Sequence, residues 1–160
     1  MSTQVPVRIE RYSNNSRCSE SVLASIKGMS ADWERRWARG HVCYLAIVGC
    51  EPASYVWIAF DGWRLADEDD PHALPESAAL VYDGITLPAW RGKNLLPALM
   101  HAAATDLAGS GYSELYGIVD DSNIASQHAL RKVGFEFTDK TVKTYRALKL
   151  ARFRRCSKLV

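Results

Sequence analysis

The sequence predicts a mixed α+β protein with one central sheet, mostly antiparallel, and helices on both faces. Two apolar runs, 78–87 and 114–119, flank an apolar helical pattern over 94–107. A strand–helix–strand order favours parallel pairing through a right-handed crossover. Upstream, residues 42–60 read as two strands joined by a tight turn. The sheet is therefore expected to combine an antiparallel part with a parallel strand–helix–strand–helix unit.

The first half predicts two short helices and a hairpin. Apolar residues over 20–39 recur at steps of three and four, which is typical of a helix. Gly28 and Ser30 are expected to divide it, with Ser30 as the N-cap of the second helix. The strands 42–48 and 54–60 are joined by the turn residues 49–52.

The second half continues the alternation. Gly109 and Gly111 end the helix that begins near residue 94. After the strand 114–119, Asp121 or Ser122 is expected to cap a short helix that ends at Gly134. One more strand is expected near residues 142–145, and the last fifteen residues fit either a strand or a helix.

Composition places the chain among ordinary globular proteins. Its 160 residues, 48% hydrophobic and 24% charged, suffice for one domain over 1–160 with a substantial core. No apolar run approaches the roughly 20 residues that cross a bilayer, and the N-terminus has no secretory pattern. The four cysteines are scattered and form no CxxC pair, which argues against zinc and predicts a cytoplasmic protein with reduced thiols.

The net charge of +2 conceals an asymmetry. Residues 139–160 carry eight Lys or Arg against one acid, a charge of +7, which leaves −5 for residues 1–138. A basic tail at about 146–160 suits contact with nucleic acid, an anionic membrane or an acidic loop of the same chain. It lacks the interleaved aromatic residues of a base-stacking surface, so we expect a solvated segment and no nucleic-acid partner. Pairing of two copies through apolar C-terminal residues is left open.

A basic turn stands where the predicted strand 78–87 gives way to a helix. Arg91, Gly92 and Lys93 precede the helix, whose N-terminus offers unpaired N–H groups and a favourable dipole to a phosphate group. Pro88 lacks an N–H and helps to end strand pairing. One crossover later, Asn123 follows the strand 114–119.

These motifs resemble those of the GNAT (GCN5-related) N-acetyltransferase superfamily. The family's V-x-P-x-x-R-G-x-G-x-G/A pattern aligns with residues 86–96, and its N-x-x-A/S and K-x-G-F patterns align with 123–126 and 132–135. The resemblance implies that acetyl-CoA is the acyl donor and that a primary amine accepts the acyl group by direct attack in a ternary complex. It implies donor-binding roles for Ile85, Thr86, Leu87, Arg91, Gly92, Lys93, Asn94, Leu95, Leu96, Asn123 and Ser126.

Three positions depart from the family pattern. Asn94 and Leu96 replace glycine or alanine in the phosphate turn, and Leu130 replaces a tyrosine that often acts as general acid. Asn tolerates left-handed geometry, whereas the Leu96 side chain is expected to stand where the backbone should approach the ligand. A catalytically silent acyl-CoA-binding or protein-interaction domain of the same fold is therefore an alternative.

Candidates for the general base are acidic. Asp83 interrupts an otherwise apolar strand beside the implied acyl site, and Glu76 lies just before that strand. The alternative for Asp83 is an Asp-Gly bulge, and for Glu76 a solvated loop position. The loop acids 67–70 and His72 are candidates for attracting a cationic amine. The backbone N–H near Leu87 is a candidate for stabilising the oxyanion.

Overall fold

The computed structural model describes residues 2–14, 20–29, 32–60, 74–146 and 149–159, and beyond Phe137 it describes the backbone alone. Within these residues one sheet has the strand order β1-β2-β3-β4-β5-β7-β6. Only β4 and β5 pair in parallel, and every other neighbouring pair is antiparallel. The strands are β1 Arg8–Tyr12, β2 Val42–Val48, β3 Glu51–Ala59, β4 Ala78–Thr86, β5 Glu114–Asp120, β6 Glu136–Arg146 and β7 Lys149–Leu159.

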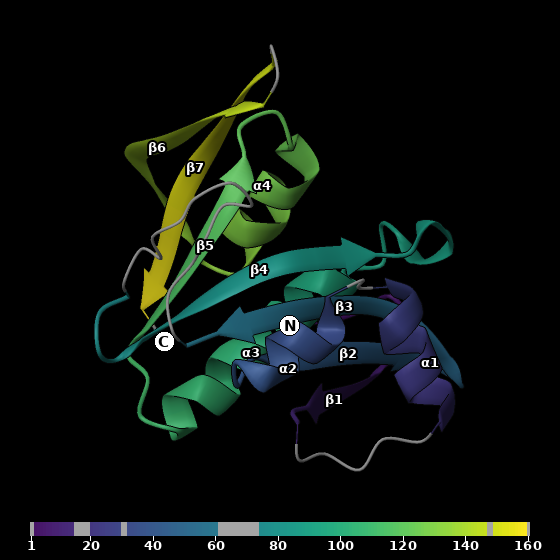
Figure 1. The fold of residues 1–160 in the computed structure, drawn as a ribbon. Helices are drawn as coiled ribbons and strands as arrows, with labels where there is room; N and C mark the ends of the chain where they lie inside the picture. The colour runs from purple at the N-terminus through teal and green to yellow at the C-terminus, as the bar shows by residue number, and fades with distance from the viewer. Residues whose placement is uncertain (1, 15–19, 30–31, 61–73, 147–148, 160) are drawn as a thin grey trace.

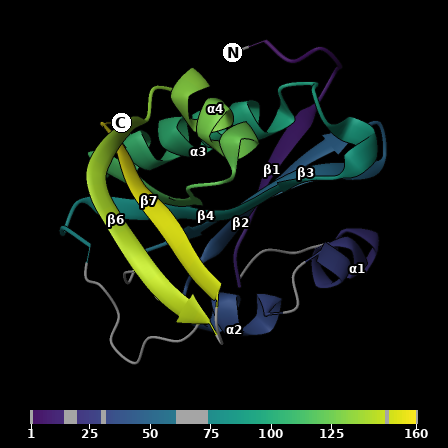
Figure 2. The same cartoon turned by 90° about the horizontal axis from the view of Figure 1, so that it is seen from above.

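Helices cover both faces of this sheet, which confirms the predicted mixed α+β class. Helices α3 (Leu95–Gly109) and α4 (Ile124–Lys132) lie on one face, and α1 (Glu20–Met29) and α2 (Trp33–Ala38) lie on the other (Figures 1 and 2). A short 3-10 turn, Pro88–Trp90, connects β4 to the segment before α3. The N-terminus of α3 therefore lies next to the carboxyl end of β4.

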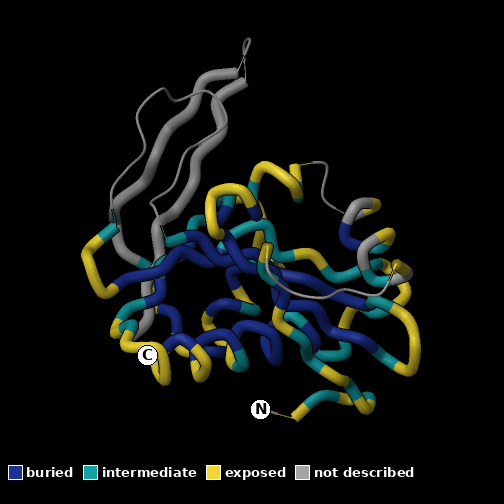
Figure 3. Tube along the Cα trace, turned by 60° about the horizontal axis from the view of Figure 1, so that its bottom comes forward, coloured by how far each residue is buried: buried dark blue, intermediate teal, exposed yellow. Residues whose placement is uncertain are grey.

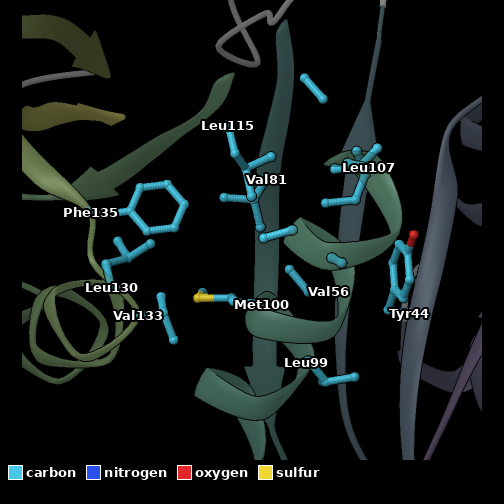
Figure 4. Close-up of a cluster of buried hydrophobic side chains, with 14 of the residues drawn as sticks. Tyr44, Val56, Val81, Leu99, Met100, Leu107, Leu115, Leu130, Val133 and Phe135 are labelled. Atoms are coloured by element: carbon cyan, nitrogen blue, oxygen red, sulfur yellow. The ribbon is translucent and has the colours of Figure 1, made fainter. Parts of the chain in front are cut away.

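Each face of the sheet has its own hydrophobic core. The larger core lies under α3 and α4, where Leu99 and Leu115 are fully buried and Leu130 is 4% exposed (Figure 4). The smaller core packs Ile26 and Trp37, from α1 and α2, against Trp57 of β3. Figure 3 shows the resulting buried strands between more exposed helices. Continuous burial of the central strands explains why 42–48 and 78–81 read as uninterrupted apolar runs.

Strands β4 and β5 pair over only part of their length. The pairs run from Ala78–Glu114 to Val81–Gly117, and the strands then diverge. On the other edge of β4, Tyr55 pairs with Ile85 and Trp57 pairs with Tyr82, so one extra residue stands opposite Val56. This β-bulge contains Asp83, whose φ is 48°. A bulge bends and twists its strand, which turns the end of β4 away from β5.

Several predicted boundaries need correction. Strand β3 begins at Glu51, so the hairpin turn is only Gly49–Cys50. The capping residue of α4 is Asn123, whose side chain accepts a hydrogen bond from Ser126 N, and not Asp121 or Ser122. Helix α2 has its N-cap at Asp32, while Ser30 lies outside the described residues.

The basic C-terminal segment is also placed differently from the expectation. It is not an irregular tail, because Lys149–Leu159 forms β7, which lies between β5 and β6. Strand β7 pairs with the whole length of β5, from Glu114 to Asp120. This pairing satisfies backbone groups of β5 that would otherwise form an exposed edge. The strand alternative for the last fifteen residues is therefore correct.

Candidate functional site

An open groove of about 600 Å³ lies between the end of β4, the turn after it and helix α4. Its described lining contains three cations, Arg91, Lys93 and Lys132, and no acidic side chain. Such a groove attracts an anionic ligand. The lining residues are Gly84, Ile85, Thr86, Trp90, Arg91, Gly92, Lys93, Asn94, Leu95, Leu96, Pro97, Asn123, Ala125, Ser126, His128, Ala129 and Lys132.

The turn before α3 presents a row of backbone donors to this groove. Gly92 has φ 77° and Asn94 has φ 60°, so two left-handed residues curl the chain around its own N–H groups. In the described part of the chain, no backbone atom outside α3 accepts a hydrogen bond from the N–H groups of residues 92–96. The first turn of α3 leaves its own N–H groups unpaired as well, although Pro97 has none to offer. These donors, with the cations around them, fit a pyrophosphate.

Two side chains fix the shape of the turn. Lys132 Nζ, at the end of α4, donates to Asn94 Oδ1 at 3.1 Å. Arg91 Nε donates to the carbonyl of Thr86, at the end of β4, at 3.3 Å. The asparagine that replaces a family glycine thus adopts the left-handed geometry and also ties the turn to α4.

Leu96 does not point into open solvent. A Cβ atom built on Gly84 would lie 2.9 Å from Leu96 Cδ1 and 3.5 Å from a methyl of Val56. The Leu96 side chain therefore lies directly over Gly84, in space that any larger residue of β4 would need. Because Leu96 is half-buried and packs against the sheet, its backbone stays available to the groove.

A second hollow of about 180 Å³ occupies the split between the diverging ends of β4 and β5. Its walls come from both faces of the sheet. Val81, Met100 and Leu130 belong to the core under α3 and α4, whereas Tyr82 and Ile118 pack on the opposite face. The split shares Gly84, Leu96, Asn123 and Ser126 with the groove, so the two hollows meet.

The lining of the split contrasts in charge with that of the groove. Its described charged residues are two carboxylates, Asp83 and Asp120, and no cation lines it. The groove lining is therefore cationic, whereas the split is lined by two carboxylates, of which Asp83 is paired with Arg36. This separation of positive and negative side chains suits an anionic ligand on one face of the sheet and a cationic ligand on the other.

Asp83 is held from the α2 side. Arg36 Nη1 lies 2.5 Å from Asp83 Oδ2, and the Arg36 guanidinium stacks 5.1 Å from the Trp57 ring and 5.0 Å from the Tyr82 ring. Both charged side chains are mostly buried, at 18% and 26% exposed. The negative charge of Asp83 also reaches Tyr55, where burial is the main cause and this carboxylate a second cause of a pKa raised to about 12.

Tyr82 is tied to the same region. Its hydroxyl lies 2.7 Å from His41 Nδ1, and the two rings contact edge to face. His41 directly precedes β2 and is 4% exposed. The bulge in β4 is therefore braced from the α2 side by two side-chain contacts, one from Arg36 and one from His41.

Asp120 ends β5, on the other side of the split. Its Oδ1 accepts hydrogen bonds from Ser122 N at 2.8 Å and Ser122 Oγ at 2.6 Å. These two bonds hold the pKa of the Asp120 carboxyl below its usual value, so the group stays ionised. Sequence reasoning overlooked Asp120. The sequence signal that could have found it is an acidic residue at the end of the predicted strand 114–119, two residues before a serine that can donate to it.

The structure brings most of the predicted donor-binding residues together. All of them line the groove except Leu87, whose N–H donates to Ala53 O at 2.9 Å. The Leu87 N–H itself is therefore already paired, so stabilisation of an oxyanion by a backbone N–H near Leu87 would need a different N–H group or the loss of this bond. Glu76 is exposed and lines neither hollow, and His72 with the loop acids 67–70 lies outside the described residues.

The described residues offer no membrane-spanning helix and no metal-binding cluster. None of the helices there is long and apolar enough to span a membrane. Likewise, no three His, Cys, Asp or Glu side chains of that part of the chain gather in a group that could hold a metal ion.

Solved structures of acetyltransferases share this fold at low sequence identity. An acetyltransferase of Bacillus subtilis in complex with CoA has TM-score 0.66 and 14% identity, covering 97% of this chain and 99% of that one. The yncA protein of Salmonella typhimurium, solved with acetyl-CoA, has TM-score 0.70 and 14% identity, covering 96% and 93%. A GNAT-family acetyltransferase of Streptococcus pneumoniae has TM-score 0.68 and 15% identity, covering 97% and 99%.

The family assignment rests on sequence as well as fold. No curated protein matches the chain. The model of the Acetyltransferase (GNAT) family, however, matches residues 12–135, which include the groove, the split and both helices that border them. The chain belongs to the GNAT acetyltransferase family.

Proposed function

We propose that this protein transfers an acetyl group from acetyl-CoA to a primary amine, by direct attack within a ternary complex. The observation that carries the proposal is the meeting of a cationic groove with an anionic split that crosses the sheet. An anionic donor and a cationic acceptor can then approach one point from opposite faces. Related structures solved with CoA or acetyl-CoA support this choice of donor.

Each part of the groove has a role in donor binding. The N–H groups of residues 92–96, with Arg91 and Lys93 beside them, would hold the pyrophosphate. The edge of β4 from Tyr82 to Thr86 is not paired with β5 and would receive the amides of the pantetheine arm. That edge spans about 13 Å, at roughly 3.3 Å per residue. Asn123 and Ser126 lie where the groove meets the split, so they would contact the donor near its acyl end.

The donor, when bound, would supply an acyl group activated as a thioester. An alkylamine with a pKa of about 10.4 is only about 0.04% neutral at pH 7, so the acceptor must first lose a proton. The neutral amine nitrogen then bonds to the carbonyl carbon, the carbon–sulfur bond breaks, and sulfur keeps the electron pair. The nitrogen loses a second proton as the amide forms, and this proton ends on the thiolate or in solvent. A thiol has a pKa near 8.5, so its thiolate leaves without a strong acid, which makes Leu130 tolerable at the position of the family tyrosine.

Asp83 stays our first candidate for the base, and Glu76 the second. Arg36 is paired with one carboxylate oxygen of Asp83, so a proton from the acceptor would have to reach the other oxygen while this ion pair is kept. A water held by the second carboxylate oxygen would satisfy both contacts. Glu76 would need the segment before β4 to approach the split, since it lines neither hollow.

The alternative is an acyl-CoA-binding or protein-interaction domain without turnover. Leu96 and Leu130 favour it, because both place an aliphatic side chain in the split where the family pattern has a small residue or a proton donor. Binding of acetyl-CoA without acetylation of any amine in a broad panel would establish this alternative.

The test is calorimetric titration with acetyl-CoA, followed by an assay of thiol release with an amine panel. The wild-type chain should bind one acetyl-CoA, and Arg91→Glu should weaken that binding at least tenfold through charge reversal beside the pyrophosphate. Arg35→Glu is the matched control, since Arg35 is an exposed residue of α2 on the other face. Equal affinities for the two variants would remove the groove from the proposal.

A further inference from the structure

The split lies where the acceptor of the proposed transfer must arrive. Side chains of β5 alternate between the two faces of the sheet. Leu115 and Val119 belong to the core under α3 and α4, while Tyr116 and Ile118 pack on the opposite face. Asp120 follows Ile118 by two residues, so it points to the face opposite α3 and α4. Its carboxylate therefore lines the acceptor end of the split.

The two carboxylates of the split differ in whether a described cation is paired with them. The charge of Asp83 is matched by Arg36 at 2.5 Å. At Asp120, Ser122 supplies neutral donors to Oδ1 alone. Among residues whose described side chains line the split, none is a cation. Among the described side chains, Asp120 thus has no cation to balance its charge, and its second oxygen accepts no hydrogen bond from them.

Ser122 gives this carboxylate a fixed direction. Two hydrogen bonds to Oδ1, from the backbone and the side chain of one residue, restrict rotation of the carboxyl group. The turn that carries them is itself held, because Asn123 N donates to Asp120 O at 2.9 Å. A positioned carboxylate loses little side-chain entropy when it accepts a charge-assisted hydrogen bond from an ammonium group.

We propose that Asp120 is the acceptor-binding carboxylate, which receives the ammonium group of a small cationic amine at the mouth of the split opposite the donor groove. This inference rests on the proposed acetyl transfer and extends it by naming the charge and the anchor of the acceptor. Asp83, neutralised by Arg36, then forms a polar wall and not a second anchor.

The test compares Asp120→Asn with Asp121→Asn. Both variants remove one negative charge from the same turn, but Asp121 does not line the split. The probes are four primary amines of different shape: ethanolamine, tyramine, lysine amide and spermidine. Their affinity for the protein, with and without CoA, is measured by NMR chemical-shift titration, and their acetylation by thiol release from acetyl-CoA.

Asp120→Asn should weaken the best amine probe at least tenfold, because a charge-assisted hydrogen bond becomes a neutral one. Its affinity for acetyl-CoA should stay within twofold of the wild type. Asp120→Glu should recover part of the amine affinity, whereas Asp121→Asn should match the wild type. Recovery by the glutamate separates charge recognition from a structural role of the turn.

Two outcomes overturn the inference: equal amine affinities for Asp120→Asn and Asp121→Asn, or a wild-type chain that binds none of the four amines. Failure to bind acetyl-CoA would refute the proposed transfer by itself. The amine titration of the chain without CoA would still decide the role of Asp120 in that case.

Discussion

The substitution Gly84→Ala should lower the free energy of unfolding of the wild type but raise that of a Leu96→Ala variant. In the wild type the new Cβ would lie 2.9 Å from Leu96 Cδ1, closer than carbon atoms approach without rearrangement. Overpacking of this kind costs about 1–3 kcal/mol. Because the clashing atom ends a half-buried side chain that can shift, we expect the lower part of that range.

The lower backbone entropy of alanine in the unfolded chain has the opposite effect on the free energy of unfolding. Gly84 has no left-handed φ, so alanine fits its backbone and reduces the entropy of the unfolded chain by about 0.4–1 kcal/mol. Gly84→Ala should therefore destabilise the wild type by about 1 kcal/mol. In a Leu96→Ala background the clash disappears, and the same substitution should stabilise the protein by about 0.5 kcal/mol.

The assay is urea unfolding of the wild type, both single variants and the double variant. The interaction energy from this cycle should be about 1.5 kcal/mol, well above the 0.3–0.5 kcal/mol by which independent sites deviate from additivity. The m-values should stay equal, which shows that the unfolded states are comparable. Additive effects would refute the conclusion that Leu96 occupies the space over Gly84.

Three further predictions follow from particular contacts. Asn94→Ala should lose about 1–2 kcal/mol of unfolding free energy because φ is 60°, whereas Asn94→Gly should retain it; equal losses would refute strain as the cause. Arg36→Met should cost about 1–2 kcal/mol in the same assay by leaving Asp83 half-buried without its cation, against under about 0.5 kcal/mol for the exposed Arg35→Met. Burial raises the pKa of Tyr55 to about 12, above its value of about 10 in the unfolded chain. The contribution of neutral Tyr55 to the free energy of unfolding is therefore fully present below pH 10 and is lost as pH rises from about 10 to 12. Tyr55→Phe should therefore flatten the fall of stability over that range by up to about 1.4 kcal/mol per pH unit, and an unchanged slope would contradict the assigned pKa.

Periodicity and turn chemistry were sufficient to predict the strand–helix–strand–helix unit. Strand β4, helix α3 and strand β5 were placed within two residues, because each is a long apolar segment with glycine or proline at its ends. The C-terminal hairpin was ambiguous since Lys149–Leu159 carries many charges. Its pairing with β5 over long sequence separation decides its structure, and no local pattern encodes that pairing.

The groove was more predictable than the split. Arg91–Leu96 form one continuous segment, the turn before α3 and the start of that helix, so residues that are adjacent in sequence are also adjacent in space. The split instead depends on where the pairing of β4 with β5 ends, which the bulge decides. Asp83 drew notice by interrupting an apolar strand, but its pairing with Arg36 joins residues 47 positions apart. Asp120 ends its strand as an ordinary turn acid, and only the divergence of the strands gives it a site to face.

One irregularity of β4 connects these features. A non-glycine residue with φ 48° costs about 1–2 kcal/mol, and such strain persists only where the surroundings impose it. Here Arg36 holds the Asp83 carboxylate, and Leu96 fills the space that Gly84 leaves. The same bulge turns the end of β4 from β5 and opens the split. Leu96, a departure from the family pattern, is thus complementary to Gly84, so each of these two residues should be tested together with the other and not alone.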